Sequence, residues 1–124
     1  MANTIQKIEK QMKKQVATST AIQLRLLAQY AQEELDARRN RWVHDMYEQF
    51  CELENSNMAT AIQVYRPDDR WTIDRVVVTY FTDKNRSKVS AGVSRLSPND
   101  IFDYRTGVAI AFARAQGKEV PDLF

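Results

Sequence analysis

The stretch Ser97–Gly117, SPNDIFDYRTGVAIAFARAQG, decides the fold that we predict for this chain. Ser97 and Pro98 suit the start of a short turn, because a hydroxyl caps a helix N-terminus and proline lacks a donor that the first turn leaves unused. Asp103 then offers a second N-cap, and Gly117 permits a left-handed stop. The stretch therefore predicts a turn followed by a helix of about 13 residues.

Small side chains line this predicted helix. They are Gly107, Ala109, Ala111, Ala113 and Ala115. The larger Val108 and Phe112 recur among them at helical spacing. Small side chains let a helix backbone lie close to the surface that it covers. We expect that surface to be a β-sheet.

The residues that precede the turn have the composition of strands. Three segments alternate or are rich in β-branched and aromatic residues, namely Ala61–Tyr65, Trp71–Thr82 and Lys88–Leu96. Turn chemistry separates them at Arg66–Arg70 and Asp83–Arg86. In the third segment Gly92 marks either a bulge or a close approach of another element. We predict an antiparallel meander within residues 58–96.

The N-terminal part is helical. Apolar residues repeat at spacings of three and four from Ile5 to Val16, and the repeat resumes from Ile22 to Leu53. Residues 17–20 (ATST) weaken it, so that either Ser19 or Thr20 starts a new helix or a kinked helix continues. The polar residues 54–57 end the helical part.

The predicted helical arm is too long for one small domain to cover. From Ile5 to Leu53 it reaches about 60 Å or more at about 1.5 Å per residue. Three short strands cannot bury so much apolar surface. We therefore expect a homo-oligomer that associates through the helices.

Together these elements predict a single α+β domain over residues 1–124. It has a long N-terminal helical arm (1–55), a three-stranded antiparallel sheet (58–96), and a turn and C-terminal helix (97–117) packed on the sheet.

The formal net charge of the chain is +2, so it does not have the strongly positive surface of a typical nucleic-acid binder. Cys51 is the single cysteine, the N-terminus lacks the apolar core of a signal peptide, and no run approaches the about 20 apolar residues of a membrane span. We expect a cytoplasmic protein that binds no membrane.

No familiar catalytic pattern is present. The sequence contains no P-loop, dinucleotide-binding glycine fingerprint or HExxH motif, and His44 is its single histidine. Asp68, Asp69 and Asp74 suit a solvated turn better than a metal site. We expect no catalytic residues, no metal and no cofactor.

Arg114 differs from the other arginines because alanines surround it. Small neighbours leave a shallow hollow below its planar guanidinium, which suits a phosphate. The alternative is that its charge favours the C-terminal end of the helix. The sequence leaves both interpretations open.

The strand, turn and helix together resemble a pattern found in several small phage and bacterial proteins. It comprises a glycine in a strand, then S-P-x-D-x-F-D, a glycine four residues on, and an A-x-A-x-A-R-A helix. The residues that carry it are Gly92, Pro98, Asp100, Phe102, Asp103, Gly107, Ala109, Ala111, Ala113, Arg114 and Ala115. The motif covers about a quarter of the chain and describes strand-turn-helix packing in large part.

Two groups show this pattern. One consists of actinobacterial proteins of unknown function whose fold is similar to the double-stranded-RNA-binding domain. The other is the first family of phage Thoeris anti-defence proteins, which sequester cyclic ADP-ribose signals and, in some members, cyclic oligonucleotides. Resemblance to the second group implies a non-enzymatic phage protein in the host cytoplasm that binds a cyclic nucleotide immune signal between subunits.

The resemblance also implies ligand-binding residues. Arg114 matches the family's helix arginine, and Ser97 stands at the first motif position, which is usually Asn. A stacking aromatic is expected on the sheet, for which Tyr80 and Phe81 are the candidates. The full candidate set is Arg114, Ser97, Phe81, Tyr80, Arg25 and Arg105, with Arg25 supplied by a partner's arm.

Two other functions stay open. The fold order suits a nucleic-acid-binding module similar to the double-stranded-RNA-binding domain. Against that function, Arg105 is the one basic residue in the first turn of the last helix. The chain also suits a protein inhibitor of a host defence component, with the helical arm as its contact surface.

Overall fold

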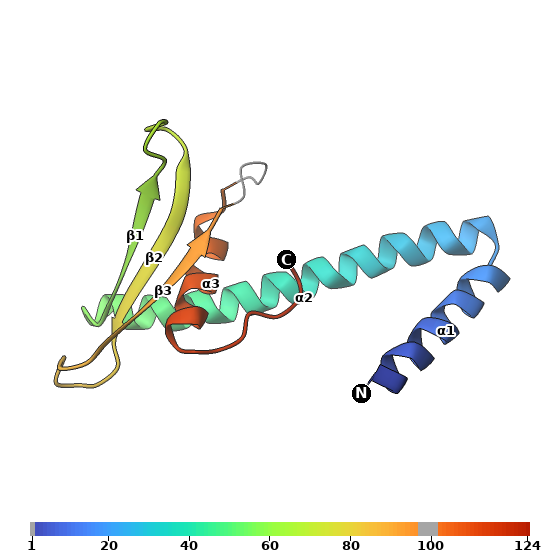
Figure 1. The fold of residues 1–124 in the computed structure, drawn as a ribbon, viewed down its shortest axis with the longest axis horizontal. Helices are drawn as coiled ribbons and strands as arrows, with labels where there is room; N and C mark the ends of the chain where they lie inside the picture. Colours follow the sequence, from blue (N-terminus) through green and yellow to red (C-terminus); the bar gives the residue numbers. More distant parts are fainter. Residues whose placement is uncertain (1, 97–101) are drawn as a thin grey trace. The chain divides into compact units, whose positions relative to one another are not determined.

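The computed structural model describes residues 2–96 and 102–124. Its elements are α1 (Ala2–Thr18), α2 (Ala21–Asn55), β1 (Ala59–Tyr65), β2 (Ile73–Phe81), β3 (Val89–Arg95) and α3 (Tyr104–Ala115). Figure 1 shows the antiparallel sheet with α3 packed on it. The predicted α+β class and element order are confirmed. The expected turn at 97–100, and with it Ser97, lies outside the described residues.

The chain forms two compact units whose boundary falls within α2. The first is Met1–Ala37 and the second is Arg38–Phe124. The second unit contains the last part of α2, the sheet, α3 and the C-terminal segment. The predicted arm therefore contributes its residues 38–55 to the unit that holds the sheet.

A capping box separates α1 from α2. The backbone N–H of Gln23 donates to Thr20 Oγ1 at 3.2 Å, and the N–H of Thr20 donates to Gln23 Oε1 at 2.9 Å. Each side chain thus satisfies a donor that a helix start leaves unpaired. The prediction that a new helix starts at Ser19 or Thr20 is confirmed, and the alternative of a kinked continuous helix is wrong.

Replacing the capping residue should loosen the first turn of α2. We expect Thr20→Ala to cost about 1 kcal/mol locally, because the Gln23 amide loses its acceptor. The amide exchange rate of Gln23 should rise about fivefold in an NMR hydrogen-exchange experiment, which corresponds to the same about 1 kcal/mol. Thr20→Ser keeps the oxygen and should exchange at the native rate. Equal rates in Thr20→Ala and the native chain would contradict the role of the cap.

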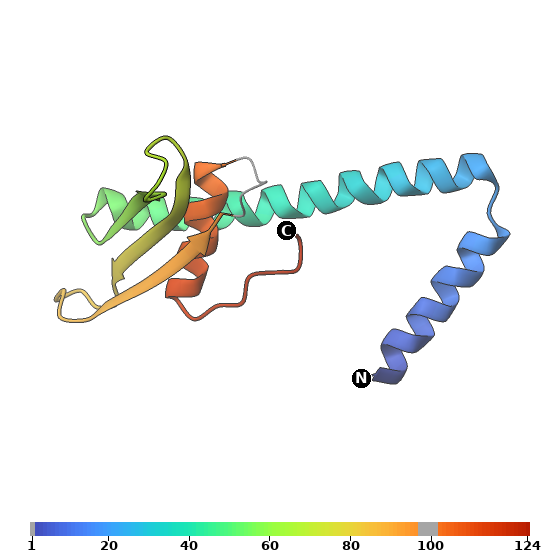
Figure 2. The same cartoon turned by 45° about the horizontal axis from the view of Figure 1, so that its top comes forward.

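The sheet has the order β1-β2-β3, and one of its faces meets the helices. On that face the residues that lie side by side on β1, β2 and β3 form three rows. The rows are Ala59, Tyr80 and Ser90; Ala61, Val78 and Gly92; and Gln63, Val76 and Ser94. Both views show α3 lying against this sheet, beside β3 and β2 (Figure 2). The rows on the other face hold Val89, Ala91 and Val93.

The second strand starts later than its composition predicted. The N–H of Trp71 donates to Asp69 Oδ1 at 2.9 Å, and the Thr72 hydroxyl donates to Asp69 Oδ2. These bonds continue the turn as far as Thr72 and leave Trp71 92% exposed. The prediction of strand at Trp71 is wrong because a local side-chain turn outcompetes β propensity.

Gly92 is the point where α3 touches the sheet. A Cβ atom at this position would lie 2.1 Å from the carbonyl oxygen of Ala111 and 2.3 Å from the amide nitrogen of Ala115. The β2–β3 register continues through Gly92 without a shift. Gly92 therefore marks a close approach and not a bulge.

The ends of α3 follow the predicted chemistry. Asp103 caps its start, accepting from the N–H of Arg105 at 3.2 Å and from Thr106 Oγ1 at 2.8 Å. Gly117 adopts φ +72° just beyond its end. Local sequence signals thus set both limits of a helix of 12 residues.

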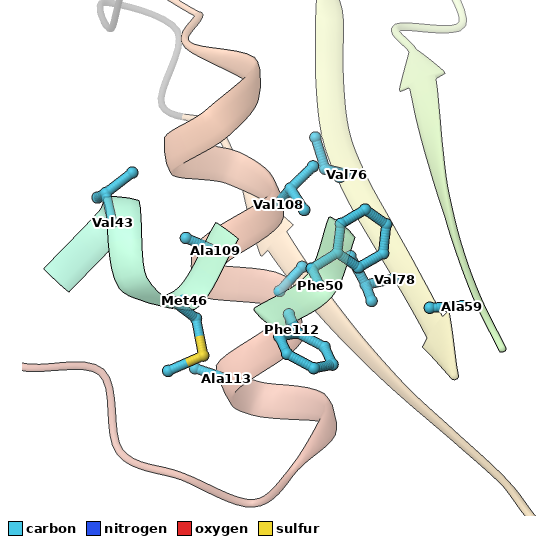
Figure 3. Packing of buried hydrophobic residues seen from close by; sticks show 11 residues of the cluster. Val43, Met46, Phe50, Ala59, Val76, Val78, Val108, Ala109, Phe112 and Ala113 are labelled. Atoms are coloured by element: carbon cyan, nitrogen blue, oxygen red, sulfur yellow. The ribbon is translucent and has the colours of Figure 1, made fainter. Parts of the chain in front are cut away.

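The core lies between the sheet and the two helices of the second unit (Figure 3). Phe50 of α2 and Phe112 of α3 meet edge to face with ring centroids 5.8 Å apart. Val76, Val78 and Val108 are buried beside them. This packing fixes the start of α3 against one end of β2 and β3, where the candidate site lies.

Candidate functional site

A cavity of about 480 Å³ lies where β2 begins, β3 ends and α3 begins. It is lined by Arg39, Asn40, Ile73, Arg75, Val76, Ser94, Arg95, Leu96, Phe102, Asp103, Thr106, Gly107, Ile110 and Phe124. All these residues belong to the second unit. The cavity thus depends on one compact part of the chain.

Strand pairing places two arginines opposite each other at the end of the sheet that borders this cavity, in the row next to Val77 and Val93 on the face that α3 leaves uncovered. Arg75 of β2 and Arg95 of β3 are direct partners in the antiparallel register. The N–H of Leu96 donates to the carbonyl of Asp74 at 2.9 Å and extends the pairing past Arg95. Like charges directly opposite each other destabilise a sheet. An anion bound beside both guanidinium groups would remove that repulsion.

The Asp74 carboxylate balances part of this positive charge. Its Oδ2 lies 2.9 Å from Nη1 of Arg75. Arg39 from α2 adds a third guanidinium to the lining, and Asp103 adds a carboxylate. Positive groups therefore outnumber negative ones around the cavity, which favours an anionic ligand.

The remaining lining is mostly apolar. Its apolar members are Ile73, Val76, Leu96, Phe102, Ile110 and Phe124. Gly107 contributes no side chain, so the start of α3 lies close to Val76, whose Cγ2 would be 3.1 Å from a Cβ atom at this position. Apolar walls with a few charged groups are typical of sites for small molecules that carry a ring and an anionic group.

Arg114 lies near the C-terminal end of α3 and is not among the residues that line this cavity. Its Nη1 donates to the carbonyl oxygen of Val93 at 2.8 Å. This bond joins α3 to the edge of β3. The side chain is exposed, and a guanidinium has further donors beside the one used here.

Tyr80 and Phe81 point to opposite faces of the sheet. Tyr80 packs edge to face on Phe112, with centroids 5.6 Å apart, as part of the core. Phe81 lies under the guanidinium of Arg86, whose Cζ is 5.8 Å from the ring centroid. Adjacent positions on a strand alternate between faces, so the two rings cannot stack on one ligand from the same side.

Arg105 lies over the ring of Tyr47, with its Cζ 5.6 Å from the centroid. Both line a smaller hollow of about 310 Å³ together with His44, Glu48, Cys51, Glu52 and Asn55. Arg25 belongs to the first unit, and Ser97 lies outside the described residues. Arg105, Arg114, Tyr80 and Phe81 therefore each have a different neighbour, and the structure does not assemble them around one cavity.

The phenols near the smaller hollow stay protonated at neutral pH. Burial raises the pKa of Tyr47, with a smaller contribution from its hydrogen bond to Cys51. Burial also raises the pKa of Tyr104, followed by the negative charge of Glu54. His44 Nε2 lies 3.3 Å from Glu48 Oε1 on the same helix face. These contacts describe a structural surface of α2.

Sequence reasoning missed Arg75 and Arg95. Their partnership depends on the β2–β3 register, which composition does not set. Counting outward from the predicted turn at Asp83–Arg86 pairs Arg75 with Ser94, because the observed connection between Thr82 and Lys88 is one residue longer than that turn.

Within residues 2–96 and 102–124, no three His, Cys, Asp or Glu side chains gather in a way that could hold a metal ion. None of the described helices is long and apolar enough to cross a bilayer.

In comparisons with known proteins, no family model, curated protein or solved structure matched the chain.

Proposed function

We propose that the chain binds and sequesters a cyclic nucleotide of the cyclic ADP-ribose type without catalysis, as a phage counter-defence protein. The observation that supports this function best is the cavity of about 480 Å³ beside the cross-strand pair Arg75 and Arg95. Small-molecule sites usually measure about 300–1,000 Å³. A cyclic dinucleotide-like ligand brings both the anion and the flat ring that such a lining accepts.

Each part of the ligand has a partner in this proposal. The pyrophosphate lies at the rim of the cavity, at the strand ends that carry Arg75 and Arg95, because guanidinium groups bind phosphate through paired, charge-assisted hydrogen bonds. The base packs against Phe102 or Phe124, since an aromatic side chain offers a flat apolar surface. Sequestration lowers the free concentration of the signal, and binding alone is sufficient for that effect.

The proposal includes self-association and a location in the cytoplasm of the host cell. A homo-oligomer would cover the apolar side chains that the first unit exposes, among them Ile5, Ile22 and Tyr30. A cyclic nucleotide signal acts in the cytoplasm, so a protein that depletes it must be present there.

A protein partner is the second candidate, and the uncovered sheet face favours it. Ile62 is 57% exposed and Val89 is 58% exposed on this face. Val77 and Val93 lie in the same row of strand partners as Ile62 and are half-buried. An inhibitor of a defence protein could bury this surface, and Ile62→Lys would then abolish its inhibition while leaving nucleotide binding intact.

Arg95→Gln tests the nucleotide proposal. We expect calorimetry with a panel of cyclic ADP-ribose isomers to give binding by the native chain, and Arg95→Gln to weaken it at least tenfold through loss of a charge-assisted contact worth about 1.5–3 kcal/mol. Arg114→Gln is the matched control. It removes the same charge from α3, and its affinity should equal the native one.

Two results would change the conclusion. A loss confined to Arg114→Gln would place the phosphate at the end of α3, where the family resemblance implied it. Absence of binding heat with every isomer in the panel would contradict the nucleotide proposal.

A further inference from the structure

Ser94 is a buried polar residue that lines the cavity of about 480 Å³. It lies on β3 directly opposite Val76 of β2, so its side chain points to the face of the sheet that α3 covers. Only 9% of the residue is exposed. A hydroxyl in such a place needs a hydrogen-bond partner, because burying it without one costs free energy.

The rest of the described chain does not supply that partner. Within residues 2–96 and 102–124 the Ser94 hydroxyl makes no hydrogen bond to backbone or side chain. Protein atoms do not enclose its oxygen completely, so it keeps access to the cavity that the residue lines. A polar group that enters the cavity can therefore pair with this hydroxyl.

The other serine on this face of β3 shows the contrast. The hydroxyl of Ser90 donates to the carbonyl oxygen of Ala115 at 2.5 Å and joins the strand to the last turn of α3. Ser90 and Ser94 are four residues apart and point to the same side of the sheet. Ser90 thus has a structural partner, whereas the described residues give none to Ser94.

The wall formed by the start of α3 carries a negative charge. The carboxylate of Asp103 caps this helix, accepting from the N–H of Arg105 at 3.2 Å and from Thr106 Oγ1 at 2.8 Å. The hydroxyl proton of Thr106 is therefore already used. A phosphate group would be repelled by this carboxylate and attracted to the strand ends that carry Arg75 and Arg95.

The space beside Ser94 suits an uncharged ring. Val76 of β2 and Ile110 of α3 line the cavity together with Ser94, and Phe102 lines it next to the start of α3. Apolar walls accept a flat ring and disfavour a charged group. A nitrogen heterocycle would also pair with the hydroxyl, which can donate to a ring nitrogen or accept from an amino group.

We propose that Ser94 recognises the base of the ligand. Its hydroxyl forms a hydrogen bond with a ring nitrogen or an amino group of a neutral nitrogen heterocycle, which lies between β3 and α3 while the phosphates stay at the rim. The inference rests on the proposed function and adds the residue that selects the base and the orientation in which it binds. A ring without a polar group at this point would leave the hydroxyl unpaired and would bind more weakly.

Adenosine tests the site for the ring because it has no phosphate. In an NMR titration of the isotope-labelled full chain, millimolar adenosine should shift the amide signals of Ser94 and Ile110. Ser94→Ala should weaken this binding about fivefold, which corresponds to about 1 kcal/mol for a neutral hydrogen bond. Arg95→Gln should bind adenosine as tightly as the native chain does, because the guanidinium lies where the phosphates would be.

Ser90→Ala is the matched control on the same strand. It should keep the native affinity for adenosine but melt about 4–8 °C lower, the shift expected when a small domain loses one internal hydrogen bond. Ser94→Ala should melt at the native temperature, because its hydroxyl holds no described protein group in place.

Three results would overturn the proposal. They are an adenosine titration that leaves the Ser94 amide signal unmoved, a Ser94→Ala variant with native affinity, and a Ser94→Ala variant that melts as low as Ser90→Ala. Failure of the proposed function gives a different pattern. In that case adenosine binds and depends on Ser94, but no cyclic ADP-ribose isomer gives binding heat.

Discussion

Gly92→Ala is expected to destabilise the second unit by about 3 kcal/mol or more. The new methyl group would lie 2.1 Å from the Ala111 carbonyl oxygen and 2.3 Å from the Ala115 amide nitrogen. Both atoms belong to the backbone of α3, so the helix as a whole must move to admit the side chain. Urea unfolding followed by circular dichroism measures the change in free energy.

The other two glycines are matched controls for this substitution. A Cβ at Gly107 would meet Val76 Cγ2 at 3.1 Å, and the alanine gains helix propensity, so Gly107→Ala should change stability by less than about 1 kcal/mol. Gly117 has open space around it but a φ of +72°, and its alanine variant should lose about 1 kcal/mol through backbone strain. A Gly92→Ala variant as stable as Gly107→Ala would refute the close contact of α3 with β3.

Phe112→Ala is expected to cost about 3–5 kcal/mol, the range for removal of a buried phenylalanine. Phe112 is 1% exposed, and its ring contacts Phe50 and Tyr80 at centroid distances of 5.8 and 5.6 Å. The substitution leaves a cavity where α2, α3 and β2 meet. Its partners cannot fill that cavity, because each is held by its own element.

Phe124→Ala serves as the control for ring removal. Phe124 is 51% exposed and contacts Trp42 edge to face at 5.6 Å. Its loss should cost about 1 kcal/mol or less, because little surface leaves water at this position. Equal losses of stability in the two variants would show that Phe112 does not organise the core.

The sequence predicted the elements whose limits depend on nearby residues. Asp103 sets the start of α3 and Gly117 follows its end, because a carboxylate cap and a glycine with positive φ each affect only the adjacent turn of a helix. At the start of α2, Thr20 and Gln23 likewise act locally, through two reciprocal hydrogen bonds between side chain and backbone. The start of β2 was missed because Asp69 holds a turn through Trp71, although the residues there favour a strand.

The candidate site was less accessible to sequence reasoning, because it depends on contacts between distant residues. Arg75 and Arg95 become neighbours only through strand register. The sequence pointed to Arg114 as a phosphate ligand because its neighbours are small. In the structure its guanidinium donates to the carbonyl of Val93, which is 21 residues away in the sequence. Whether it also binds a ligand stays a prediction, which the Arg95→Gln and Arg114→Gln pair tests.

The bond from Arg114 to Val93 has a consequence for how the sheet meets other chains. β3 is an edge strand, and an edge strand offers free backbone groups on which a foreign strand can add. Arg114 Nη1 occupies the Val93 carbonyl at 2.8 Å, and the Ser90 hydroxyl donates to the Ala115 carbonyl at 2.5 Å, so the last turn of α3 lies along that edge. We therefore expect a foreign strand to add at the opposite edge, β1, in preference to β3.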